Sequence, residues 1–185
     1  SIKSPLKDLV INILNEYKSK ILKIPYSINH HPPLSGSFLK HLVRTSNIAI
    51  DILPHYPNLD RDLAITGLIL HDIGKVKSIN EDMIPGYTNE GKLLGHIILG
   101  RDLVIDVARS IKNFPIDLLL KLEHIILSHQ KPQSSSVAVV PKIPEALFVQ
   151  FIDDLDRNLN TMQEIIENDF NLDWTAYQKN FKTKF

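Results

Sequence analysis

The chain contains no cysteine and no excess of charge of either sign. Without thiols it can build neither a disulfide framework nor a thiolate metal site. Its 21 lysines and arginines balance its 21 aspartates and glutamates, so no overall basic field marks it as a dedicated nucleic-acid binder. A neutral total does not exclude a local basic groove.

Long hydrophobic runs are also missing. No apolar stretch approaches the roughly 20 residues that span a bilayer, and Lys3, Lys7 and Asp8 stand where a signal peptide would need its apolar core. We therefore expect a cytoplasmic protein with no membrane segment. The chain begins at Ser1 rather than Met, which suggests a processed chain or an excised domain with a missing neighbour.

What the sequence does contain is helical periodicity. The 185 residues suit one domain, 1–185, with a sizeable core. Apolar residues recur at helical spacing between proline, glycine and capping signals; the expected helices are 5–22, 37–53, about 60–70, 92–112, 115–129 and 144–168, with a short last helix near Trp174 and Tyr177. Loops are expected at 23–36, 76–92 and 130–144. The pattern predicts an all-α fold of six or seven helices around one core.

One apolar run ends abruptly in polar residues. The run through Leu70 is followed by His71 and Asp72, then Gly74 and Lys75. Neutral imidazole and carboxylate are usual ligands of divalent Mn, Fe, Co or Zn. The pair therefore predicts a metal site, and a polar helix cap is the alternative interpretation.

Further histidines and acids lie at helix-compatible positions. His41 stands beside apolar Leu42, His96 follows the small Gly95, and Asp153 shares a helix face with Ala146 and Val149. These positions suit side chains that point inward. By contrast, Asp154 and Asp156 are expected to be solvated charges on a helix face. The loop residues His30 and His31 and the serines at 134–136 are expected to face solvent.

His124 and His129 lie near the end of one predicted helix. Five residues correspond to about 140° around a helix, so the two imidazoles cannot both face one metal from a straight helix. We expect His129, at the helix end, to be the ligand. His124 is expected to have a structural role or to hydrogen bond to a metal ligand. It could bind metal itself only if the helix end unwinds between residues 124 and 129.

The order of these histidines and aspartates along the chain resembles that of the HD superfamily of metal-dependent phosphohydrolases. The resemblance extends to the HD domain of the YhaM-type 3′→5′ exoribonucleases over roughly residues 5–160, with a core at about 34–160. It rests on Gly36 to His41, His71 to Lys75, Tyr87 to Ile97, His124 to His129, and Glu145 to Asp156. Two departures stand out: those enzymes also carry an N-terminal OB-type nucleic-acid-binding domain, and Gln130 follows His129 where many two-metal HD proteins have consecutive histidines.

The resemblance implies a ligand set. His41, His71, Asp72 and Asp153 would hold one metal, and Asp72 would bridge to a second metal held by His96 and His129. Because glutamine is a poor ligand beside imidazole, Gln130 implies one firmly bound divalent metal and a weaker second one, with Mn, Fe, Co or Mg as candidates.

The resemblance also implies roles in catalysis. Asp72 and Lys75 are the catalytic candidates, because a lysine beside the ligands can stabilise charge that develops on a phosphoryl group. The alternative for Lys75 is an exposed residue after a helix stop. Arg44 and Arg101 either contact substrate phosphates or belong to the surface.

These expectations lead to three functional hypotheses. The first is a metal-dependent phosphohydrolase or phosphodiesterase that acts on RNA ends or nucleotides. The second is a small-nucleotide phosphohydrolase for monophosphates or cyclic dinucleotides, which the neutral charge favours. The third is a non-catalytic nucleotide- or RNA-binding module. The sequence does not indicate an oligomeric state.

Overall fold

The computed structural model describes residues 2–28, 35–130, 139–169, 173–179 and 181–185. Within them the helices are α1 (Leu6–Glu16), α2 (Lys18–Lys23), α3 (Ser37–Ile52), α4 (Arg61–Leu70), α5 (Lys75–Ser78), α6 (Asn89–Ser110), α7 (Ile116–Ser128) and α8 (Pro144–Asn168), with a 3₁₀ turn η1 (Leu53–His55). The predicted all-α class is confirmed. His30, His31 and the serines at 134–136 lie outside the described residues.

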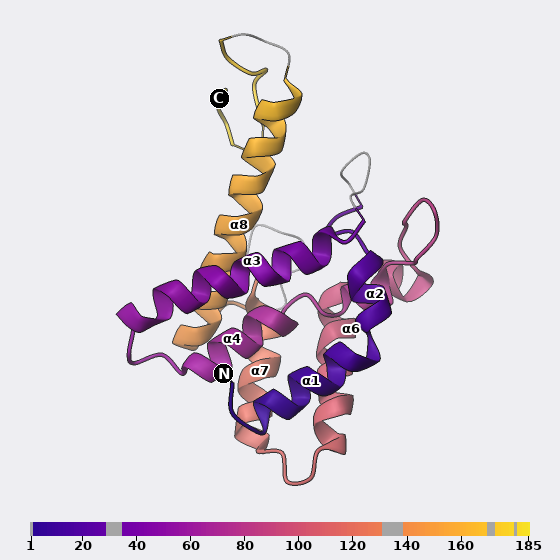
Figure 1. Cartoon of the computed structure of the whole chain (residues 1–185), viewed down its shortest axis with the longest axis vertical. Helices are drawn as coiled ribbons and strands as arrows, with labels where there is room; N and C mark the ends of the chain where they lie inside the picture. Colours follow the sequence, from indigo (N-terminus) through magenta and orange to yellow (C-terminus); the bar gives the residue numbers. More distant parts are fainter. Residues whose placement is uncertain (1, 29–34, 131–138, 170–172, 180) are drawn as a thin grey trace.

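Helix α4 forms the centre of the bundle. It packs against α1, α3, α7 and α8, and Figure 1 shows it enclosed by these neighbours while the far half of α8 extends away from them. Seven of its residues are buried, which leaves almost no exposed face: Leu63, Ala64, Ile65, Thr66, Gly67, Leu68 and Leu70. The end of α4 therefore delivers the next residues, His71 and Asp72, into the interior.

Local signals decide several helix boundaries. The expected helix 5–22 is divided at Tyr17, where the backbone leaves the helical region (φ −103°, ψ 12°). Helix α6 begins at Asn89, three residues earlier than expected, because the Thr88 side chain accepts a hydrogen bond from Gly91 N. The expected loop 76–92 also contains the end of α5, whose Val76 is buried.

The expected last helix is absent from the described residues after α8. The chain there is mostly irregular, and an isolated antiparallel bridge joins Gln178 and Thr183. None of the helices in the described part of the chain combines the length and the apolar content that crossing a membrane requires.

Candidate metal centre

Five helices bring the predicted ligands to one place. His41 comes from α3, His96 from α6, His129 caps the end of α7 and Asp153 comes from α8, while His71 and Asp72 follow α4. The described residues that could hold a metal ion form two groups, and Asp72 belongs to both. The structure thus assembles all six predicted ligands, and their role as ligands stays a prediction.

The first group contains His41, His71, Asp72 and Asp153. His71 Nε2 lies 3.4 Å from His41 Nε2 and 3.5 Å from both Asp72 Oδ2 and Asp153 Oδ1. All four side chains are buried. Ligand atoms about 2.1 Å from one ion lie roughly 3.0–3.5 Å apart, so these separations fit a shared divalent ion.

The second group contains Asp72, His96 and His129. The other carboxylate oxygen, Asp72 Oδ1, lies 3.1 Å from His96 Nε2 and 3.6 Å from His129 Nε2. Asp72 therefore presents one oxygen to each group. The His96 side chain is 21% exposed, so the second group is the more accessible of the two.

Backbone carbonyls fix the orientation of two imidazoles. His71 Nδ1 lies 2.8 Å from Leu68 O, and His129 Nδ1 lies 2.8 Å from Ile126 O. Each Nδ1 must therefore donate a hydrogen, and in the neutral ring Nε2 then directs a lone pair at the carboxylates. Lone pairs and carboxylate oxygens repel each other unless a proton or a metal ion lies between them.

Two further observations favour a metal. Asp72 Oδ1 is buried, yet it accepts no well-formed hydrogen bond from the described residues. Burial raises the pKa of Asp72, but the neighbouring groups, chiefly the Lys75 ammonium, outweigh burial and hold that pKa well below its usual range. Burial also lowers the pKa of His129, whereas at His71 the neighbouring Asp72 and Asp153 outweigh burial and raise the pKa. Ionised carboxylate and neutral imidazole are the forms that bind metals, so the donor set fits a divalent ion.

Close backbone approach sets the spacing between the two groups. A Cβ at Gly74 would lie 1.9 Å from His96 O and 2.4 Å from Gly100 N, so only glycine lets the turn after Asp72 rest on α6. Gly95 has a positive φ of 74° and interrupts α6 directly before His96, a conformation that suits glycine. Both glycines thus help to bring His96 to Asp72.

Asp156 is not the solvated charge that the sequence suggested. It is only 3% exposed, its Oδ2 lies 2.8 Å from His41 Nδ1, and it accepts hydrogen bonds from the Arg44 side chain through both oxygens. A carboxylate behind a ligand imidazole fixes its tautomer and orientation. Asp156 follows Asp153 by three residues on α8, and this spacing was the signal that could have identified it.

Asp154 was also expected to be solvated, and it too is buried, at 3% exposure. The Arg157 guanidinium, one turn later on α8, donates a hydrogen bond to Asp154 Oδ1. Burial of this carboxylate is therefore accompanied by a charge partner, as buried charges require.

Sequence reasoning did not single out Tyr26. Its hydroxyl donates to Asp153 Oδ1 at 3.2 Å, and its ring lies 3.7 Å from Lys75 Nζ. Burial and the nearby Asp153 raise the pKa of Tyr26 well above its usual value, so the hydroxyl keeps its proton. No periodic or motif signal marks a tyrosine in an irregular segment before a helix.

Lys75 and Gln130 lie against the two ligand groups. Lys75 Nζ is 2.5 Å from Asp72 Oδ2, so its ammonium lies directly beside the first ligand group. The Gln130 side-chain nitrogen lies 3.1 Å from His96 Nε2. In this orientation the Gln130 amide donates a hydrogen bond to the Nε2 lone pair of His96, which a second metal would need.

Two predicted site residues lie elsewhere. His124 Nε2 accepts a hydrogen bond from Lys142 N at 2.7 Å, because α7 stays regular and turns this imidazole away from His129. Arg101 pairs with Glu123 and Asp102 and shows no contact with either ligand group among the described residues. These contacts favour a structural role for His124 and do not favour contact between Arg101 and a substrate.

These features define a class of protein, an all-α domain whose helices converge on buried imidazole and carboxylate ligands. The HD domain family matches residues 38–158, and the chain belongs to this family. Its predicted resemblance to the YhaM-type exoribonucleases is also confirmed by the relatives below.

The chain is similar to curated exoribonucleases over most of its own length. It is 36% identical over 171 residues to the 3′-5′ exoribonuclease YhaM of Bacillus licheniformis, which covers 90% of this chain and 53% of that relative. It is 35% identical over 158 residues to YhaM of Bacillus subtilis, which covers 84% of this chain and 49% of the relative. The chain thus spans about half the length of these relatives. A search of solved structures found no significant match.

Proposed function

We propose that the chain is a metal-dependent phosphohydrolase that cleaves phosphodiester bonds at RNA ends. The observation that carries this proposal is the pair of ligand groups that share Asp72. A divalent ion, when bound there, would act as a Lewis acid toward phosphoryl oxygens and lower the pKa of water. The names of the relatives favour RNA as the substrate.

Some residues of the site are proposed to bind metal, and others to stabilise charge on the substrate or to orient a ligand. His41, His71, Asp72 and Asp153 would hold the first metal, and Asp72, His96 and His129 the second. Lys75 is proposed to stabilise negative charge on the substrate phosphate. Asp156 would keep the His41 ring in its ligand orientation, and Arg44 would contact substrate phosphates beside His41.

The two metals are proposed to bind unequally. The first group offers four buried protein ligands, whereas the second offers three, one of which is hydrogen bonded to Gln130. We therefore expect one firmly held ion and a second that arrives at higher metal concentration. Mn, Fe, Co and Mg are the candidate metals for both ligand groups.

An activity panel tests the proposal. The purified chain would be incubated with 5′-labelled oligoribonucleotides, nucleoside monophosphates and cyclic dinucleotides, with Mn²⁺, Co²⁺, Fe²⁺ or Mg²⁺. Stepwise shortening from the 3′ end is the expected result. Release of phosphate from mononucleotides alone would favour the second hypothesis, a small-nucleotide phosphohydrolase, which the zero net charge supports.

A non-catalytic nucleotide-binding module is the remaining alternative. Elemental analysis separates it from the enzymes, because a scaffold has no need for a bound metal. A cytoplasmic location also remains a prediction, which cell fractionation would test.

A further inference from the structure

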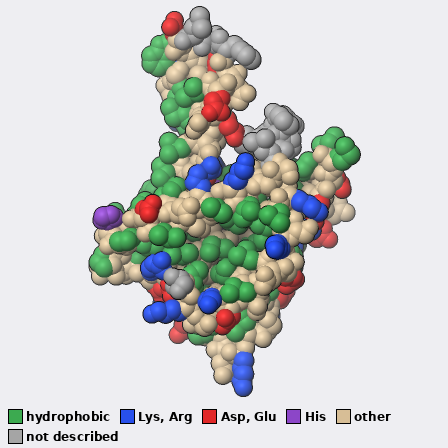
Figure 2. Space-filling model, in the orientation of Figure 1, with side chains coloured by type: hydrophobic (Ala, Val, Ile, Leu, Met, Phe, Trp, Pro, Cys, Tyr) green, Lys and Arg blue, Asp and Glu red, His purple; other side chains and the backbone are tan. Residues whose placement is uncertain are grey.

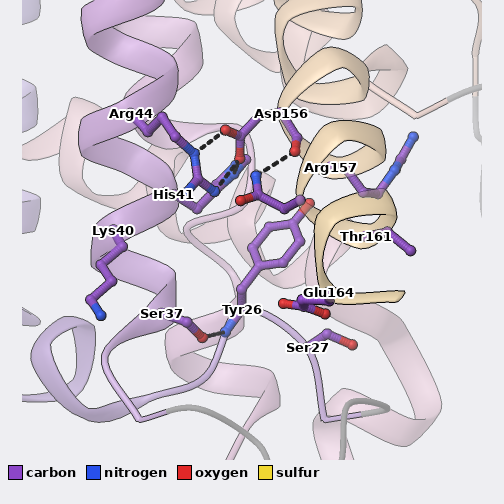
Figure 3. Close-up of a pocket in the computed structure, with 11 residues that line it drawn as sticks. Tyr26, Ser27, Ser37, Lys40, His41, Arg44, Asp156, Arg157, Thr161 and Glu164 are labelled. Carbon is purple, nitrogen blue, oxygen red and sulfur yellow. Dashed lines mark hydrogen bonds and ion pairs between the residues drawn. The ribbon is translucent and has the colours of Figure 1, made fainter. Parts of the chain in front are cut away.

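A cavity of about 150 Å³ lies beside the first ligand group. It is enclosed by α3, by α8 and by the segment that carries Tyr26, and His41 belongs to both its wall and the ligand group. Figure 3 shows Lys40 and Arg44 on the α3 side and Arg157 and Thr161 on the α8 side. The cavity therefore adjoins the place where the scissile phosphate would lie.

The lining of the cavity carries charges of both signs, and both of its arginines are already paired with carboxylates. Three cations, Lys40, Arg44 and Arg157, face two carboxylates, Asp156 and Glu164. Arg44 is paired with Asp156 and Arg157 with Asp154. Figure 2 shows lysine and arginine side chains gathered where α8 rises from α3.

Lys40 differs from the two arginines. It is exposed on the first turn of α3, directly before His41. Within the described ranges of the chain, its ammonium forms no ion pair and no hydrogen bond. Lys40 is therefore the cation in this lining that can contact an anionic group without first breaking an ion pair.

The other lining groups suit sugar and phosphate better than a base. The Tyr26 ring already contacts the His41 ring at 4.3 Å between centroids and Lys75 Nζ at 3.7 Å, so it offers no free stacking platform of the kind that holds single-stranded bases. Thr161 adds a hydroxyl, and Asn160 adds an amide whose nitrogen also donates to the backbone carbonyl one turn earlier on α8; hydroxyls and amides hydrogen bond phosphate and sugar oxygens. The volume is also well below the roughly 300–1,000 Å³ of pockets that enclose whole drug-sized ligands.

We propose that this cavity binds the phosphate next to the scissile one, with Lys40 as its cationic contact. The inference rests on the proposed function and adds a preference for substrates with at least two phosphates, while a substrate with one phosphate is hydrolysed with lower affinity. A mononucleotide or a dinucleoside monophosphate would leave the cavity empty of phosphate. Substrates that are one phosphate longer would gain affinity there.

The test compares ApA, which has only the scissile phosphate, with ApApA, which also has a neighbouring one. Initial rates in Mn²⁺ would be measured for the wild type, for Lys40→Gln, and for Lys7→Gln, a matched control at an exposed lysine on α1. Lys40→Gln should raise KM for ApApA on the order of tenfold, the effect of losing one charge-assisted phosphate contact. It should leave kcat for ApApA and both constants for ApA unchanged, and Lys7→Gln should match the wild type.

The salt dependence gives a second measurement. The slope of log KM for ApApA against log salt concentration should fall by about 0.7 in Lys40→Gln, because one phosphate contact to a single strand is lost. Equal effects on ApA and ApApA, or no effect on either, would overturn the assignment of the cavity. A wild-type protein that hydrolyses neither oligonucleotide would instead overturn the proposed function, and this inference with it.

Discussion

Asp72 is the residue on which both ligand groups depend. Its two oxygens face different imidazoles, and Lys75 is its one close cation among the described residues. No other described residue belongs to both groups. Its removal should therefore affect both metals at once.

Asp72→Ala should abolish hydrolysis, by on the order of 10³-fold or more, and should strip metal from the protein while the helical fold survives. The physical reason is the loss of the shared ligand. Activity, metal content and circular dichroism would be measured beside Asp51→Ala, a control at an exposed position of α3. Wild-type activity in Asp72→Ala would show that the chemistry lies elsewhere.

Tyr26 makes one contact through its hydroxyl and another through its ring, and two substitutions can test these contacts separately. Tyr26→Phe removes the hydroxyl that donates to Asp153 and keeps the ring beside Lys75, so it should cost about 1 kcal/mol of unfolding free energy and little activity. Tyr26→Leu also removes the ring and should lower kcat on the order of tenfold, because Lys75 loses its support. Urea unfolding and kcat measure the two effects; equal losses of kcat in both variants would rule out the role of the ring.

Gln130 is expected to weaken metal binding by the second group. Gln130→His replaces an amide that bonds to His96 with a possible imidazole ligand, so the metal content per chain should rise toward two. Elemental analysis after dialysis against Mn²⁺ measures this change. Two fully bound ions in the wild type without added metal would contradict the expectation of a weaker second group.

At the scale of elements, the contact between the turn after α4 and α6 positions His96. Gly74→Ala should cost about 3 kcal/mol or more of unfolding free energy, because its Cβ would overlap the backbone at His96 and Gly100. Gly86→Ala is the matched control, since the nearest atom to its Cβ would be Asn80 Nδ2 at 3.9 Å; its effect should stay within about 0.5 kcal/mol. Similar unfolding midpoints for the two variants would show that α6 adapts to the extra carbon.

At the scale of the whole molecule, the helices meet at the ligand groups, so metal binding should stabilise the entire fold. An ion at 100 times its dissociation constant contributes about 2.7 kcal/mol, which corresponds to a Tm change of about 5–10 °C for a chain of this size. Treatment with EDTA should therefore lower Tm by that amount, and added Mn²⁺ should restore it. An unchanged Tm, together with full activity in EDTA, would contradict a metal at this centre.

Local chemistry determined much of what the sequence predicted. Apolar periodicity fixed the helical class, because a helix can bury an apolar face only at that spacing. The same periodicity placed His41, His96, His129 and Asp153 at helix ends or on inward faces, and the resemblance to the HD superfamily then implied that these residues meet the His71–Asp72 pair. An inward position is a signal within a single helix, whereas the convergence of five helices was implied by the resemblance alone.

Other features were decided only by tertiary structure. Asp156 looked like a surface charge because its partners, His41 and Arg44, are over 100 residues away. Tyr26 reaches Asp153 from an irregular segment, and Arg101 is paired with Glu123 of α7 rather than directed at the ligands. Burial and partners depend on how distant helices pack, and no local pattern encodes them.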